Sequence, residues 1–139
     1  MMRILGIDYG ERRIGLAISD RQQLIAQPLR TIEYDDIRVA IEEITALCEE
    51  ESVKLIILGD PIHLSGDTGT IGYKVRAFSD SLSKSTGKEI IMMDERFSSV
   101  EAERAVRALG DKPSLNKAKI DNIAAALILD AFLQRDRDD

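Results

Sequence analysis

The feature that most constrains the fold is a pair of strand patterns at the start of the chain, separated by a short polar link. Arg3–Asp8 and Arg13–Asp20 are rich in Ile and Leu, and Tyr-Gly-Glu-Arg lies between them at 9–12. Such a short link containing Gly favours an antiparallel hairpin. Leu24–Glu33 fits a third strand, in which Pro28 marks an edge position or a bulge. We therefore predict an antiparallel meander at the start of the fold.

The remainder of the chain alternates between helical and strand patterns. In chain order, these patterns predict a helix over Asp36–Glu51, a strand over Val53–Leu58, a helix over Ile71–Ser85, a strand over Glu89–Met93, a helix over Ser98–Leu109 and a helix over Lys117–Gln134. A meander followed by such alternation predicts an α/β fold with a mixed β-sheet, in which parallel strands follow the meander and helices cover both faces. We expect residues 135–139 to form a frayed, charged tail.

Length and composition bound the class of protein. A chain of 139 residues that is 44% hydrophobic fits one ordinary domain with its own core, over residues 1–139, and argues against a two-domain cleft enzyme. The single cysteine, Cys48, excludes an internal disulfide and a cysteine-rich zinc site, and it lies on the apolar stripe of its helix. Asp8 comes too early for a signal peptide, and no other run approaches the roughly 20 apolar residues of a membrane span. We expect a cytoplasmic protein with no membrane association.

The charge balance argues against a protein that coats nucleic acid. Nineteen basic and 25 acidic residues give a net charge of −6, whereas a protein that coats nucleic acid is normally basic overall. A nuclease stays compatible with this balance, because carboxylates that hold metal add to the acidic count. Any polyanion would then have to be bound by a local basic patch.

Several carboxylates stand where chemistry is expected in an α/β fold. Asp8 ends the first strand, and Asp94 and Glu95 follow the strand over 89–93, at the edge where open α/β sheets bind ligands. Asp8 could instead only start a turn, and Asp94 and Glu95 could belong to a solvated loop. Carboxylate oxygens without His or Cys suit Mg²⁺ or Mn²⁺ better than zinc. Such ions can activate water and stabilise the leaving oxygen of a phosphodiester.

Asp121 is a further candidate, from a third element of the fold, because of its place on the last helix. At about 100° per residue, one apolar stripe of that helix comprises Ile120, Ile123, Ala124, Leu127, Ile128 and Ala131. Asp121 then falls at the margin of the stripe, and Asn122 and Leu133 fall on the outer face. A carboxylate in such a place is unfavourable unless it is paired or binds a cation. The alternative is a favourable interaction with the positive end of the helix.

Three motifs together resemble one known family. Leu-Gly-Ile-Asp-Tyr-Gly-Glu-Arg-Arg-Ile-Gly-Leu-Ala-Ile-Ser-Asp at 5–20 resembles the opening of the YqgF/RuvX family of RNase H-like proteins. Asp-Glu-Arg-Phe-Ser-Ser at 94–99 resembles the DER motif of that family, and Lys-Ile-Asp-Asn-Ile-Ala-Ala-Ala at 119–126 resembles its late Asp-x-x-Ala-Ala motif. The motifs occur in the right order and span nearly the whole chain.

The resemblance implies a site and an activity. It implies an RNase H-like nuclease with Asp8, Glu95 and Asp121 as catalytic, metal-binding residues for Mg²⁺ or Mn²⁺, and with Asp94 as a competitor of Glu95. It also implies a substrate, the precursor of 16S ribosomal RNA, and contact with ribosomal particles. Holliday junction resolution on DNA is the other activity attached to the family, and the sequence does not decide between the two.

One segment departs from the family pattern. Asp60 precedes Pro61, and His63 and Ser65 stand where the family usually has an Asn and an acidic residue. Asp60 could join the metal site or only cap the loop. His63 is the only histidine, and it could act as a general acid or base or be a surface imidazole.

Basic residues accompany the candidate carboxylates along the chain. The candidates for nucleic-acid contact are Arg12, Arg13, Lys74, Arg96 and Lys119. If they surround the carboxylates, they supply the phosphate contacts that the overall charge does not. Ordinary solubilising charge is the alternative interpretation.

Two other functions fit parts of the pattern. The first is a nucleotide-binding ATPase of the actin/Hsp70 type, whose first hairpin also carries Asp-x-Gly, but 139 residues are too few for its two domains. The second is a non-catalytic RNA- or ribosome-associated binding module. The joint presence of Asp8, Glu95 and Asp121 argues against that second function.

Overall fold

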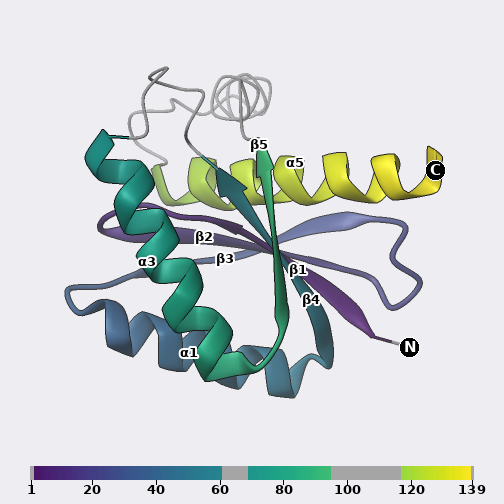
Figure 1. The fold of residues 1–139 in the computed structure, drawn as a ribbon. Helices are drawn as coiled ribbons and strands as arrows, with labels where there is room; N and C mark the ends of the chain where they lie inside the picture. The colour runs from purple at the N-terminus through teal and green to yellow at the C-terminus, as the bar shows by residue number, and fades with distance from the viewer. Residues whose placement is uncertain (1, 61–68, 95–116, 139) are drawn as a thin grey trace.

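The structure, a computed structural model, describes residues 2–60, 69–94 and 117–138 (Figure 1). Its helices and strands follow the order β1 (Arg3–Asp8), β2 (Arg13–Ser19), β3 (Ala26–Glu33), α1 (Ile37–Glu50), β4 (Val53–Asp60), α3 (Gly69–Thr86), β5 (Glu89–Asp94) and α5 (Lys117–Asp138). The helix predicted over Ser98–Leu109 lies outside the described residues. Each of the other predicted helices and strands is present, with ends that differ by a few residues.

Within the described residues, the strands form one five-stranded sheet in the order β3-β2-β1-β4-β5. β1 pairs antiparallel with β2 and β2 pairs antiparallel with β3, whereas the pairs β1–β4 and β4–β5 are parallel. The predicted mixed sheet, with a leading meander and later parallel strands, is confirmed. β1 therefore lies at the centre of the sheet, between its antiparallel and its parallel halves.

Pro28 lies both at an edge and at a bulge. β3 is an edge strand, and its register with β2 shifts between Leu16, which pairs with Arg30, and Ala17, which pairs with Pro28. Leu29 is the extra residue of β3 at this shift. A proline cannot donate a ladder hydrogen bond, so an edge and a bulge are the positions that tolerate it.

Helices cover both faces of the sheet, as predicted (Figure 1). On one face, Leu5 and Ile7 of β1 pack in a core with Ile44 of α1 and Leu82 of α3, and Cys48 is buried there as expected. On the other face, the side chains of α5 pack with those of the sheet, in a cluster formed by Ile4, Ala17, Ile57, Ala125, Ile128, Leu129 and Leu133. Among the described residues, no helix is both long and apolar enough to cross a membrane.

Two glycines let α5 pack directly against the backbone of the sheet. A Cβ atom on Gly6 of β1 would lie 2.8 Å from Leu129 Cβ and 2.9 Å from the Ala125 carbonyl oxygen. A Cβ atom on Gly15 of β2 would overlap the backbone carbonyl of Asp121. Because real side chains do not tolerate such overlaps, glycine at these two positions sets how close α5 lies to the sheet.

The buried face of α5 differs from the predicted stripe. Leu133, which we predicted on the outer face, is only 2% exposed, whereas Ala131 of the predicted stripe is exposed. The buried positions Ala125, Leu129 and Leu133 follow Asp121 at intervals of four residues. The prediction was partly right, because Ala124 and Ile128 of the predicted stripe are buried. The rest was wrong because 123–129 is a continuous apolar run, in which periodicity alone cannot select a face. Close packing on the glycines selects it instead.

The C-terminal end of α5 also differs from the prediction. We expected the helix to end near Gln134 and residues 135–139 to be frayed, but the helix continues to Asp138. No Gly or Pro interrupts 135–138, so nothing in the sequence ends the helix there. Gln134 Nε2 also donates a hydrogen bond to Asp130 Oδ2 at 2.8 Å, one turn earlier on the helix.

The contact between Gly15 and α5 generates the first prediction. Gly15→Ala places a methyl group against the Asp121 carbonyl, so we expect a loss of at least about 3 kcal/mol in the free energy of unfolding, the upper end of ordinary overpacking. Gly87→Ala is the control, because Gly87 has a φ of +69° but nothing within 4 Å of an added Cβ. Its cost should stay near the roughly 1–2 kcal/mol of a left-handed residue. Urea unfolding measures both, and equal losses would contradict the prediction.

Candidate active site

Asp8 lies at the C-terminal end of β1 and on the face that α5 covers. Side chains alternate between the two faces of a strand, and Ile4 and Gly6 of β1 both contact or approach α5. Asp8 has the same parity as these two residues, so its side chain is directed to the α5 face. Its Cα partner on β2 is Gly15.

Asp121 lies in the first turns of α5, directly over the same part of the sheet. The Asp121 backbone packs on Gly15, which is the register partner of Asp8. The structure therefore brings Asp8 and Asp121, 113 positions apart in the sequence (121 − 8), to the same end of the same sheet face. Asp121 was predicted at the margin of the apolar stripe, and its side chain is half-buried, one helical turn before the buried Ala125.

An ion pair holds the Asp121 carboxylate. Arg13 Nε of β2 donates a hydrogen bond to Asp121 Oδ2 at 2.7 Å. The Asp121 side chain is 22% exposed and that of Arg13 is 34% exposed, so both are partly removed from water. Burial raises the pKa of Asp121 above its ordinary value, and the Arg13 hydrogen bond and charge oppose that rise. Burial is the larger effect, which leaves the ionised carboxylate in an unfavourable environment.

The other candidate carboxylates lie at the same edge of the sheet or outside the described residues. β1, β4 and β5 run parallel, so their C-terminal ends lie at the same end of the sheet. The register pairs the Cα positions of Asp60 and Asp94 there. Glu95 and His63 lie outside the described residues. Within 2–60, 69–94 and 117–138, no three His, Cys, Asp or Glu side chains are grouped as a metal site. The three-residue ligand set thus stays a prediction, with two of its members brought to one place.

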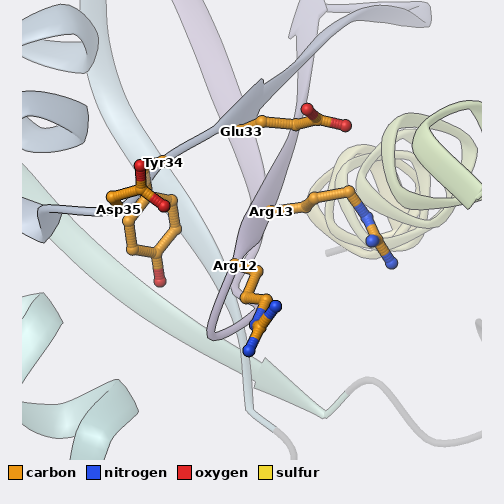
Figure 2. Close-up of a pocket in the computed structure, with 5 residues that line it drawn as sticks. All are labelled: Arg12, Arg13, Glu33, Tyr34 and Asp35. Atoms are coloured by element: carbon orange, nitrogen blue, oxygen red, sulfur yellow. The ribbon is translucent and has the colours of Figure 1, made fainter.

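The predicted basic residues have different positions. Figure 2 shows Arg12 and Arg13 on the wall of a pocket of about 450 Å³ that Glu33, Tyr34 and Asp35 complete. The remaining candidates are elsewhere: Lys74 of α3 pairs with Glu11 at 3.2 Å, Lys119 belongs to the first turn of α5, and Arg96 lies outside the described residues.

Sequence reasoning missed two features of this site, the hydrogen bonds of Tyr34 and the ion pair between Arg13 and Asp121. Tyr34 Oη donates a hydrogen bond to the Gly10 carbonyl oxygen at 2.6 Å, and Tyr34 N donates to the Arg12 carbonyl oxygen at 3.0 Å. These bonds join the β1–β2 link to the segment after β3. The antiparallel register of the meander, which pairs Arg13 with Glu33, was the available signal for Tyr34. No local pattern signals the ion pair between Arg13 and Asp121.

The raised pKa of Asp121 generates the second prediction. A carboxyl group whose pKa is raised by folding destabilises the fold when it is ionised, so the penalty is absent below the ordinary value of 3.8 and grows as the pH rises through the raised pKa. We therefore expect Asp121→Asn to be at least as stable as wild type at pH 7 in EDTA. Its relative advantage should shrink toward acidic pH.

Thermal melts across this pH range measure the effect. Asp130→Asn is the matched control, because it removes the same charge from the same helix but affects a residue that contacts Gln134. For Asp130→Asn, the melting temperature relative to wild type should not rise with pH. An Asp121→Asn variant that is less stable than wild type at pH 7 would mean that the Arg13 ion pair outweighs the effect of burial.

Comparison with known proteins agrees with the resemblance found in the sequence. The family model RuvX, described as Holliday junction resolvase, matches residues 2–135. A protein of Chloroflexus aurantiacus named "Putative pre-16S rRNA nuclease" is 42% identical over 134 residues, which are 96% of this chain and 88% of the relative. A protein of Acetivibrio thermocellus with the same name is 42% identical and is covered to 95%, as is this chain.

Solved structures agree with the fold. RuvC of T. thermophilus in complex with a Holliday junction substrate has a TM-score of 0.60 at 16% identity and covers 96% of each chain. The Fowlpox virus resolvase, in complex with Holliday junction DNA, has a TM-score of 0.57 at 14% identity, over 96% of this chain and 98% of the viral one. At such identities the likeness concerns the fold alone, which is that of the RNase H-like resolvases.

The match over 2–135 and the 42% identity of the relatives assign the family, and the fold is consistent with it. The chain belongs to the RuvX family and is a hydrolytic nuclease that acts on phosphodiester bonds.

Proposed function

We propose that this chain is a divalent-metal-dependent endonuclease that matures the precursor of 16S ribosomal RNA, with Asp8, Glu95 and Asp121 as its metal ligands. One observation carries the proposal: Asp8 pairs in register with Gly15, and the backbone of Asp121 packs on the same glycine. Two carboxylates from distant parts of the chain thus share one end of the sheet face under α5. We further propose that the protein acts in the cytoplasm, in contact with ribosomal particles.

The chemistry of the two carboxylates fits a hard divalent cation. Mg²⁺ and Mn²⁺ prefer carboxylate oxygens, and both described members of the proposed set are aspartates. Burial disfavours ionised Asp121, and a cation at this place would offset that cost. When bound, the metal would activate a water molecule and stabilise the leaving oxygen of the phosphodiester. The aspartates would hold the metal, and Arg12 would bind substrate phosphate at the neighbouring pocket.

The names of the relatives support ribosomal RNA as the substrate. The relatives at 42% identity are named as nucleases of the 16S rRNA precursor, and the structures bound to Holliday junctions are only 14–16% identical to this chain. The description of the family as Holliday junction resolvase supports branched DNA as the alternative substrate. Incubating the protein with precursor 16S rRNA and with a four-way DNA junction, in the same Mn²⁺ buffer, distinguishes them by which substrate is cut.

The third prediction concerns catalysis. Asp8→Asn removes a charged metal ligand, so we expect the rate of RNA cleavage to fall by at least about 100-fold, or about 2.7 kcal/mol of transition-state stabilisation. Cleavage by wild type should require Mg²⁺ or Mn²⁺ and stop in EDTA. Asp130→Asn, which removes an equal charge from α5, should keep the wild-type rate. Gel assays of RNA cleavage measure all three, and full activity of Asp8→Asn or of wild type in EDTA would refute the metal-nuclease function.

The fourth prediction separates Glu95 from Asp94. Asp94 and Glu95 are adjacent in the sequence, and we expect only one of them, Glu95, to join Asp8 in a metal site. Excess Mn²⁺ at about 100 times its Kd should stabilise wild type by about 2.7 kcal/mol. Glu95→Gln and Asp121→Asn should lose most of this gain in thermal melts, and Asp94→Asn should keep it. The reverse result for Asp94 and Glu95 would make Asp94 the ligand.

A further inference from the structure

The Arg13–Asp121 ion pair is the contact that the proposed function leaves unexplained. Arg13 Nε donates to one carboxylate oxygen of Asp121, Oδ2, at 2.7 Å, across 108 positions of sequence. Figure 2 shows the Arg13 side chain extending from β2 toward α5, whereas Arg12 points in a different direction. A guanidinium therefore already binds the carboxylate that we propose as a metal ligand.

A guanidinium and a divalent cation repel each other when both bind one carboxylate. Both are positive, and the partial burial of the Asp121 side chain weakens the screening of their repulsion by water. Movement of the Arg13 side chain away from the carboxylate would relieve this repulsion. The Arg13 side chain is one-third exposed, so solvent and the adjoining pocket of about 450 Å³ leave it room to move.

The adjoining pocket suggests where the guanidinium goes. Arg12 and Arg13 line it together with Glu33, Tyr34 and Asp35. The two carboxylates would repel a phosphate, so an anionic backbone passing this pocket depends on the two arginines. A planar guanidinium offers the paired donors that bind phosphate oxygens well.

We propose that Arg13 is an exchangeable counter-cation, which neutralises Asp121 in the metal-free protein and releases it to a divalent cation, so that the freed guanidinium can bind a phosphate of the nucleic acid. This inference rests on the proposed role of Asp121 as a metal ligand. Arg13 is then a positioning residue for the metal and a phosphate-binding residue for the substrate. It links the two binding events without contacting the scissile bond.

Metal affinity provides the first test. Arg13→Gln removes the competing charge, so calorimetric titration should give a Kd for Mn²⁺ at least about fivefold lower than that of wild type, the low end of coupling between linked sites. Arg38→Gln is the charge-matched control, because Arg38 pairs with Asp36 beside α1, and its Kd should equal that of wild type. An unchanged or higher Kd in Arg13→Gln would overturn the exchange, since a guanidinium that merely orients Asp121 makes metal binding weaker when removed.

Wild-type protein provides a second test that does not depend on the folding of a variant. In ¹H–¹⁵N spectra, the Arg13 Nε–H signal should show a hydrogen-bonded guanidinium in EDTA and move to the position of a free arginine at saturating Mg²⁺. Arg13→Lys, which removes that signal, assigns it. A signal that keeps its hydrogen-bonded position in Mg²⁺ would overturn the exchange.

Binding of a 2′-O-methyl oligoribonucleotide, shown on a gel to stay intact during the measurement, tests the second half of the proposal. In Mg²⁺, the slope of log affinity against log salt should be shallower for Arg13→Gln than for wild type by about one phosphate contact. In EDTA the two slopes should agree, because Asp121 then holds Arg13. Equal slopes in Mg²⁺ would overturn the phosphate contact.

Failure of the proposed ligand set would look different from failure of the exchange. If Asp121→Asn binds Mn²⁺ as tightly as wild type, Asp121 is not a ligand and both proposals fall. If metal binding depends on Asp121 but Arg13→Gln does not tighten it, only the exchange is refuted.

Discussion

The contact between α5 and the glycine backbone of the sheet determines most of the geometry that matters for function. Gly6 and Gly15 lack the Cβ atoms that would keep the helix away, so α5 packs against main chain at Asp121, Ala125 and Leu129. Main-chain contact fixes both the height of the helix over the sheet and its rotation. The rotation of the helix places the Asp121 backbone on Gly15, which is the register partner of Asp8. A helix packed through ordinary side chains would lie farther out, and its carboxylate would reach more water.

The same contact partly buries the Asp121 carboxylate, and Arg13 of the β1–β2 hairpin compensates its charge. Close packing partly removes Asp121 from water, which disfavours its ionised form, and Arg13 on β2 offsets part of that cost. Arg13 and Gly15 are two positions apart on β2, so both face α5. Gly15 allows the close approach of the helix, and Arg13 neutralises the Asp121 carboxylate on that helix. In a chain with a net charge of −6, this positive charge matters through its position and not through its contribution to the total.

The sequence predicted the elements whose patterns are local. Alternation and continuous apolar runs indicated the strands, and Pro28 indicated the edge and the bulge, because its missing N–H excludes a central ladder position. The buried face of α5 was predicted only in part, since its apolar run gives no period and the decisive glycines lie over 100 positions away. For the site, Asp8 and Asp121 were named from the sequence, whereas the Arg13–Asp121 pair depends on tertiary packing that no local pattern records.

The hairpin formed by β1 and β2 unites the two tasks that a nuclease of this kind must perform. Asp8 is the last residue of β1, Arg12 directly precedes β2 and Arg13 is the first residue of β2. A carboxylate and the arginines that would bind phosphate therefore flank one short link. Tyr34 joins that link to the end of β3 through its bonds to the Gly10 and Arg12 carbonyl oxygens. Because both bonds restrain main chain, they limit how far the arginines can move relative to Asp8. Motion is then left to the side chains, which is where an exchange of Arg13 between carboxylate and phosphate would require it.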